Sequence, residues 1–133
     1  MRIFSFLTMG KDRSNGEVQQ KEVIAWQQYF NDNPTTLGSI PVYHFPVLSG
    51  VPFFVKGPIK KALYDYYADI VNPARVGVLF VSKTEKFAKK AAIPSGDESI
   101  LVVVASDGTI KGFVTGGVTP LKIGQLKSVL AAL

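Results

Sequence analysis

Side chains able to do chemistry are sparse in this sequence of 133 residues. There is no cysteine, which excludes disulfides, thiolate nucleophiles, zinc–thiolate sites and iron–sulfur clusters. The one histidine, His44, lies in an apolar stretch; no G-x-S-x-G motif is present, and no carboxylates stand at metal-ligand spacing from it. We interpret His44 as a packed or hydrogen-bonded residue, and we predict no catalytic residue, no metal site and no cofactor.

The glycine-bounded loop of residues 10–16, G-K-D-R-S-N-G, is the second place where chemistry could occur. A phosphate-binding P-loop needs a glycine five residues before its Gly-Lys pair and Ser or Thr directly after the lysine. Those positions hold Ser5 and Asp12, which excludes a P-loop. A weaker small-anion site stays open, because free N–H groups and the helix dipole attract anions at a helix N-terminus.

The net charge and the lengths of the apolar runs restrict which kinds of partner and which cellular compartments are possible. The formal net charge is +5, and lysines gather in residues 56–61 and 83–90, which is typical of solvated helix faces and would also suit an acidic partner. No nucleic-acid motif is present, and no apolar run approaches the ~20 residues that span a bilayer. Residues 1–9 are too short for a signal peptide. The compartment stays open between the cytoplasm and, if a leader has been removed, the cell envelope; the oligomeric state stays open too.

The spacing of apolar residues predicts one globular α/β domain over residues 1–133. Its elements follow the order β-α-β-α-β-α-β-β-α. In the first helix, Val18, Val23, Trp26 and Phe30 fall near one face, which we expect to be buried. Strands are expected at residues 2–9, 40–48, 76–81, 100–105 and 110–115, and helices at 15–30, 57–70, 84–92 and 120–130.

Two local signals refine this order. Pro41 and Pro46 argue against a fully paired central strand, or for strand ends and a bend at those positions. Asp107-Gly108 predicts a type I′ turn, which needs positive φ at both central residues, so the last two strands form an antiparallel hairpin. Each earlier strand leads to a helix, which predicts parallel strands with right-handed crossovers and hence a mixed sheet of about five strands.

This order resembles the thioredoxin-like superfamily, and most closely its peroxiredoxin and TlpA-type members. In those proteins the closing hairpin reads strand, D-x-D-G, strand, glycine, then helix, and residues 105–116 fit that pattern. Residues 76–93 resemble the segment that forms a strand, a short turn and a helix in the same proteins. The resemblance covers nearly the whole chain and implies a three-layer α/β/α sandwich.

Both catalytic hallmarks of that superfamily are missing from this sequence. The redox-active cysteine lies in the loop after the first strand, where a helix N-terminus lowers the pKa of a thiol. The matching residues 8–16 contain no thiol. The cis-proline of the superfamily precedes the first hairpin strand, and Ser99 stands at that position here. The resemblance with these two departures implies a fold reused for binding.

A narrower resemblance is to the thioredoxin-like mitochondrial ATP synthase assembly factors, which also lack the redox motif. Residues 53–67, FFVKGPIKKALYDYY, resemble their basic and aromatic helix before the third strand. The three tyrosines of this segment cannot all face the core from one helix, so at least one is expected on the surface beside a lysine. The two phenylalanines that precede the helix favour an apolar patch.

We therefore predict a non-catalytic binding or assembly module whose partner is a protein, for which an acidic surface would suit the net charge. The predicted contact surface comprises Met9, Gly10, Lys11, Asp12, Arg13, Ser14, Ser99, Lys56, Lys60, Tyr64 and Tyr67. Two alternatives stay open. One is a thiol-dependent oxidoreductase or peroxidase-like protein whose cysteine is absent or supplied by a partner. The other is a small-anion binder at the N-terminus of the first helix.

Overall fold

The computed structural model describes residues 2–9, 13–94 and 97–132, and for residues 7–9 and 13–15 it describes the backbone alone. Strands and helices alternate in these residues in the predicted order. They are β1 (Arg2–Met9), α1 (Arg13–Asp32), β2 (Val42–Ser49), α2 (Lys56–Tyr67), β3 (Leu79–Val81), α3 (Thr84–Ala91), β4 (Ile100–Val104), β5 (Ile110–Thr115) and α4 (Pro120–Ala131), with short 3-10 turns η1 (Phe53–Val55) and η2 (Pro73–Arg75).

The sheet is mixed, and its strand order is β3-β2-β1-β4-β5. β1 and β2 run parallel, as do β2 and β3, whereas β4 is antiparallel to both β1 and β5. Helices join the parallel strands, because such a connection must return from one end of the sheet to the other. The β-α-β unit of β1, α1 and β2 and the β-β-α unit of β4, β5 and α4 meet where β1 pairs with β4, which forms a thioredoxin-like fold, as predicted.

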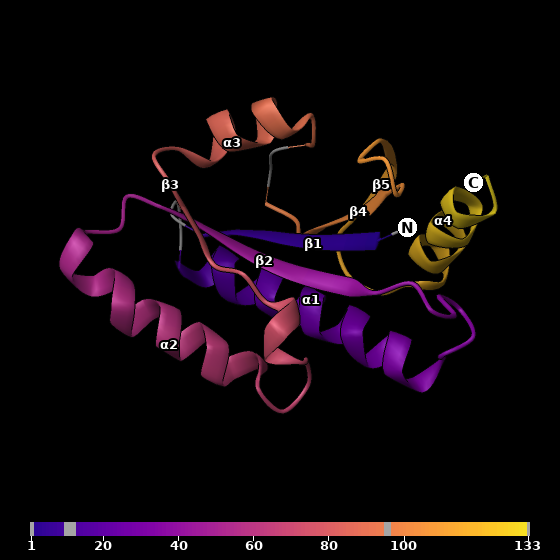
Figure 1. Ribbon diagram of the computed structural model, residues 1–133, viewed down its shortest axis with the longest axis horizontal. Helices are drawn as coiled ribbons and strands as arrows, with labels where there is room; N and C mark the ends of the chain where they lie inside the picture. The colour runs from indigo at the N-terminus through magenta and orange to yellow at the C-terminus, as the bar shows by residue number, and fades with distance from the viewer. Residues whose placement is uncertain (1, 10–12, 95–96, 133) are drawn as a thin grey trace.

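The helices cover the two faces of the sheet unequally. α1 and α4 meet in one apolar cluster, and α2 joins their side through Tyr67, whose ring stacks on His44 of β2. α3 covers the opposite face, where its Phe87 contacts Phe6. Figure 1 shows α1 and α2 on one side of the sheet and α3 on the other. The result is the predicted α/β/α sandwich, with a helix of eight residues as its thinner layer.

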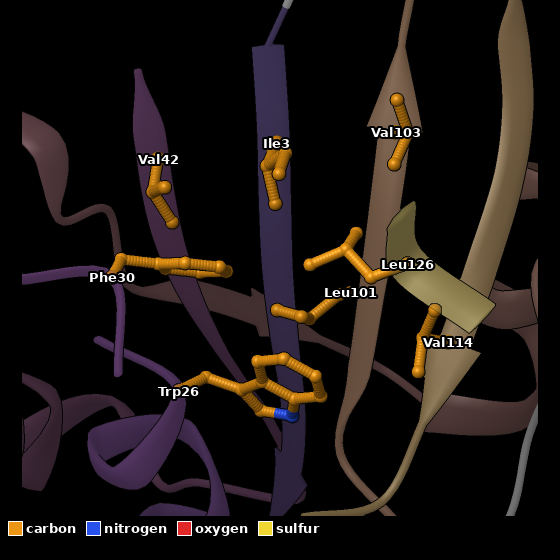
Figure 2. Close-up of a cluster of buried hydrophobic side chains, with 8 residues drawn as sticks. All are labelled: Ile3, Trp26, Phe30, Val42, Leu101, Val103, Val114 and Leu126. Atoms are coloured by element: carbon orange, nitrogen blue, oxygen red, sulfur yellow. The ribbon is translucent and has the colours of Figure 1, made fainter. Parts of the chain in front are cut away.

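The main core lies between the sheet and helices α1 and α4. Trp26 is fully buried there, and its indole Nε1 donates a hydrogen bond to the carbonyl of Gly116 at 2.9 Å. A buried indole N–H needs such an acceptor, so this bond fixes α1 against the end of β5. Figure 2 shows the buried side chains of this core, which are Ile3, Trp26, Phe30, Val42, Leu101, Val103, Val114 and Leu126.

The third strand begins later than predicted, at Leu79, and Val76 keeps only an isolated bridge to His44. The carbonyl of His44 accepts a hydrogen bond from the Gly77 N–H at 2.9 Å, on the side of β2 that faces β3. Pro46 is two residues further along β2, so its nitrogen points to the same side and has no hydrogen to donate. The pairing is therefore interrupted between the bridge and the strand.

The turn between β4 and β5 is not of type I′. Gly108 has φ of +90°, but Asp107 does not have the positive φ that a type I′ turn also requires. The Gly108 N–H donates to the carbonyl of Ala105 at 2.9 Å, and the Ala105 N–H donates to the carbonyl of Thr109 at 2.8 Å. Hairpins with this three-residue loop use a type I turn followed by a left-handed residue. The predicted hairpin is confirmed, and its predicted turn type is wrong.

The buried stripe of α1 also differs from the prediction in its first turns. The sequence predicts that Val18 faces the core, but this side chain is 54% exposed. Gln19 is fully buried instead, and Gly16, Gln19, Val23 and Trp26 follow the three- and four-residue spacing of one helix face. The prediction failed because a polar residue occupies a buried position.

Candidate functional site

The predicted contact surface begins at the end of β1. Met9 is the last residue of β1 and pairs with Leu48 of β2, so the two parallel strands end at the same edge of the sheet. Arg13 and Ser14 are the first residues of α1. The other contact residues predicted after β1, Gly10, Lys11 and Asp12, lie outside the described residues. The anion site that depends on them therefore stays a prediction.

Ser99 lies directly before β4 and is buried, with 2% of its surface exposed. Its N–H donates to Glu22 Oε1 at 3.1 Å, and its Oγ donates to the carbonyl of Gly116 at 3.4 Å. Glu22 belongs to α1, so this contact joins the start of the hairpin to the first helix. No cis peptide bond occurs among the described residues. The side chain of Ser99 is inside the fold and is not available to a partner.

The predicted lysines of α2 lie beside aromatic rings. Lys56 Nζ is 5.3 Å from the centroid of the Phe80 ring, and Lys60 Nζ is 5.9 Å from the centroid of the Tyr64 ring. Both distances are within the ~6 Å over which a cation is attracted to an aromatic face. Lys60 stays exposed while it makes this contact. α2 therefore presents positive charge together with aromatic surface.

Two phenylalanines directly before α2 are exposed to an unusual degree. Phe53 and Phe54 form most of η1 and are 88% and 80% exposed, more than any other large apolar side chain that the structure describes. Tyr66 of α2 is 44% exposed. Exposed aromatic rings with cations nearby are typical of protein interfaces. Phe53, Phe54, Lys56 and Lys60 follow one another along η1 and the first turns of α2, and we call these four residues the aromatic–lysine surface.

Phe53, Phe54 and Tyr66 are not among the predicted contact residues. The sequence signal that could have included the phenylalanines is their position between Pro52 and the start of a helix. Two consecutive side chains in such a short connection point in different directions, so one element cannot bury both. The apolar character of this segment was predicted, and its almost complete exposure was not.

The tyrosines of α2 divide between the surface and the core. Tyr66 is exposed, as predicted for at least one of them. Tyr64 is half-buried, and its hydroxyl donates to the carbonyl of Val76 at 2.9 Å. Tyr67 is 1% exposed, and burial raises the pKa of its hydroxyl. Tyr67 is therefore a core residue and does not belong to the contact surface.

His44 is buried inside a hydrogen-bonded network. Its Nδ1 lies 2.6 Å from Ser5 Oγ, and its Nε2 lies 2.8 Å from Gln27 Oε1. Burial lowers the pKa of His44 from 6.5 to about 4, so the ring is neutral at pH 7. Both ring nitrogens are occupied and the side chain is 1% exposed, which leaves no access for a substrate. The interpretation of His44 as a packed and hydrogen-bonded residue is confirmed.

Neither a metal-binding cluster nor a membrane-spanning helix is found in the described part of the chain. In residues 2–9, 13–94 and 97–132, no group of three or more histidine or acidic side chains is arranged to hold a metal ion. Among the helices that the structure describes, none is both long enough and apolar enough to cross a membrane.

Known proteins offer a structural likeness and no sequence match. The crystal structure of StoA from Bacillus subtilis is similar over 97% of this chain and 81% of that chain, with a TM-score of 0.48 and 20% sequence identity. No protein-family model matches the chain, and no curated protein sequence matches it. The thioredoxin-like assignment therefore rests on the strand order, strand directions and helix positions described above.

Proposed function

We propose that this chain is a thioredoxin-like binding or assembly module that contacts a protein partner and performs no thiol chemistry. The observation that carries this proposal is the exposure of Phe53 and Phe54, which precede the lysines of α2 in the chain. Apolar surface in water is unfavourable, and an aromatic side chain offers about 150–250 Å² for burial. A partner that covers these rings would therefore gain binding free energy from them.

The position of the aromatic–lysine surface supports the same proposal. η1 follows β2, and the end of β2 lies beside the end of β1, where the predicted loop of residues 9–16 begins. This is the end of the sheet at which the thioredoxin-like superfamily keeps its redox cysteine. Because the chain has no cysteine, this end offers a recognition surface without the reactive group.

The charges of α2 indicate the character of the partner. Lys61 Nζ lies 2.8 Å from Asp65 Oδ2, so the charge of Lys61 is paired within α2 itself. Lys56 and Lys60 lie over aromatic rings and have no such carboxylate contact among the described residues. A partner with an apolar pocket and a rim of Asp or Glu would bury the rings and pair with these two cations.

Photo-crosslinking tests the proposed surface. A benzophenone amino acid at position 53 or 60 should give a discrete cross-linked protein in extracts of the native source. The same probe at position 121 is the matched control, because Leu121 is also an exposed apolar residue, 69% exposed, but lies on α4. Crosslinks at 53 and 60 that weaken with added salt support the proposal. Equal crosslinking at 121, or none at 53 and 60, would contradict it.

A second experiment separates binding from thiol chemistry. The double variant Phe53→Ser/Phe54→Ser should lose the crosslink at position 60 while its unfolding midpoint stays unchanged, because both rings are exposed. Insulin reduction and peroxide consumption should stay at background for the wild-type chain, with and without the cross-linked partner. Measurable turnover in the presence of the partner would favour the alternative in which a partner supplies the thiol.

A further inference from the structure

The face of the sheet that carries α3 contains an apolar groove. Its lining residues differ from those of the aromatic–lysine surface. Its cavity volume is about 350 Å³. The floor includes Phe4 and Phe6 of β1 and Phe45 of β2, whose rings contact one another. Phe87 of α3 lines one side, and Ile110 of β5 lines the other. Every residue that lines the groove is apolar or glycine.

The groove exists because α3 covers only part of this face. A helix of eight residues is about 12 Å long, which is too short to extend over all five strands. Apolar surface continues from the groove onto β5, where Ile110 is 37% exposed and Phe113 is 45% exposed. Phe113 pairs with Val102, which lines the groove, so both lie on the same face.

Cations border this apolar surface. Arg2 pairs with Val104, and Val104 pairs with Ile110, so the three positions form a row across β1, β4 and β5. Residues directly opposite each other share a face, which places the exposed Arg2 at the end of the groove. On α3, the exposed Lys86 and Lys90 directly precede the two residues that line the groove. Two carboxylates lie near these residues in sequence: Glu85 precedes Lys86 in the first turn of α3, and Asp107 accepts the Thr109 N–H at 2.9 Å within the hairpin turn.

The chemistry of the lining selects among possible occupants. An extended peptide would bring backbone N–H and C=O groups, and the side chains around the cavity offer them no hydrogen-bond partner. An α-helix is about 10–12 Å wide, which is more than a cavity of this volume can enclose. An unbranched hydrocarbon chain has no polar groups to satisfy and is narrow enough to enter. The arginine and lysines at the border would pair with a negative head group.

We infer that this groove binds one single-chain anionic amphiphile of the fatty-acid class, with the hydrocarbon chain over Phe4, Phe6 and Phe45 and the carboxylate near Arg2. This binding site is separate from the aromatic–lysine surface and from the protein partner proposed above. Its volume falls within the range of about 300–1,000 Å³ that is usual for small-molecule pockets, at the small end.

Calorimetric titration of the full chain with octanoate, decanoate and dodecanoate, each below its micelle concentration, tests the inference. Each added CH₂ group that enters the groove should tighten the dissociation constant about fourfold. Decyltrimethylammonium has a similar chain and a positive head, so it should bind more weakly than decanoate. Methyl NMR signals of Val102, Val104 and Ile110 should move on titration, and those of Leu126 and Val129 on the other face should not.

Variants locate the site and separate its two parts. Ile110→Asp should weaken decanoate binding at least tenfold, because it places a negative charge on the groove wall. Arg2→Glu should raise the dissociation constant of decanoate about two- to fivefold and leave the dissociation constant of neutral decanol unchanged. Leu121→Asp and Lys127→Glu, on α4 at the opposite face, are the matched controls and should bind as wild type does.

Three results would overturn the inference. They are a dissociation constant that does not depend on chain length, equal affinity for the two head groups, and methyl shifts that spread over both faces of the sheet. Ile110 is partly exposed in the fold, so we expect the Ile110→Asp variant to fold. A thermal melt of this variant, made before binding is measured, tests that. If it is unfolded, the NMR shifts of the wild-type chain decide the question.

Discussion

Ser5 Oγ lies 2.6 Å from Nδ1 of His44, and the two residues are direct partners in the pairing of β1 with β2. Because the oxygen of Gln27 accepts at Nε2, that nitrogen carries the proton, and Nδ1 accepts a hydrogen bond from the Ser5 hydroxyl. A neutral imidazole is thereby satisfied at both nitrogens within the core. The two hydrogen bonds of His44 join β1 and β2 to α1. The stability of the fold therefore depends on whether the His44 ring is neutral or charged.

Acid should destabilise the fold through His44. Burial lowers the pKa of His44 from 6.5 to about 4. Between these values the unfolded chain binds a proton that the folded chain does not, so the free energy of unfolding falls as the pH is lowered through this window. The full contribution is present above pH 6.5, and about 3 kcal/mol is lost by pH 4. Urea unfolding at several pH values from 7 to 4 measures this loss.

The control for this pH dependence is His44→Gln, which removes the titrating ring. The variant should be less stable than the wild type at pH 7, and the difference between the two should shrink as the pH approaches 4. A difference that stays constant over this range would show that His44 does not carry the effect.

Ser5→Ala should lower the free energy of unfolding by about 1–3 kcal/mol at pH 7, because it leaves the buried Nδ1 of His44 without a donor. Urea denaturation with tryptophan fluorescence as the readout gives the value, since Trp26 is buried in the neighbouring core. Ser106→Ala, at an exposed position of the hairpin turn, is the matched control and should change stability by less than about 0.5 kcal/mol.

Tyr67→Phe should leave stability unchanged or raise it by up to about 1 kcal/mol. The Tyr67 hydroxyl is buried, and none of the described residues forms a hydrogen bond with it. The substitution keeps the ring that stacks on His44, with 5.6 Å between centroids, and removes only the unsatisfied group. Thermal unfolding of the variant and the wild type measures the change.

Tyr64→Phe on the same helix provides the comparison. Its hydroxyl donates to the carbonyl of Val76, so its removal should cost about 1 kcal/mol. The prediction fails if Tyr67→Phe is the more destabilising of the two variants.

Gly112→Ala should destabilise the fold by about 1–3 kcal/mol through overpacking against α4. A Cβ at Gly112 would lie 2.8 Å from Cγ1 and 2.9 Å from Cγ2 of Val129, and a valine side chain is too stiff to move away easily. The double variant Gly112→Ala/Val129→Ala should recover part of the loss. Gly124→Ala, in α4 with open space around its Cα, should instead stabilise by up to about 1 kcal/mol. Chemical denaturation of the four proteins gives the comparison.

The sequence predicted the order of elements and the mixed sheet because hydrophobic periodicity and the hairpin signal are local properties. It failed where the outcome depends on pairing between distant segments. Pro46 predicted a break in the pairing of its own strand, but the place of that break, before β3, depends on which neighbour the Pro46 nitrogen faces, and this follows from the pairing of His44 with Gly77. The buried Gln19 similarly occupies a position that an apolar pattern assigns to a neighbouring residue.

The contact surface was predicted less completely than the fold. Lys60 and Tyr64 lie on α2 as expected, because residue type and helical spacing place them near each other. Tyr67 and Ser99 are buried, since helix rotation and the carboxylate of Glu22 decide their surroundings and neither is encoded locally. Phe53 and Phe54 became prominent only when the structure showed that no element covers them.

The central position of β1 has a consequence for how the chain folds during synthesis. β1 is synthesised before the other four strands of this sheet, yet its two neighbours in the sheet are β2 and β4, and β4 begins at Ile100. One edge of β1 therefore stays unpaired until β4 has been made, with Phe4 and Phe6 on one of its faces. Pairing over so long a separation slows folding and leaves an aggregation-prone edge exposed. We expect the nascent chain to depend on chaperone binding near β1 until the hairpin of β4 and β5 completes the sheet.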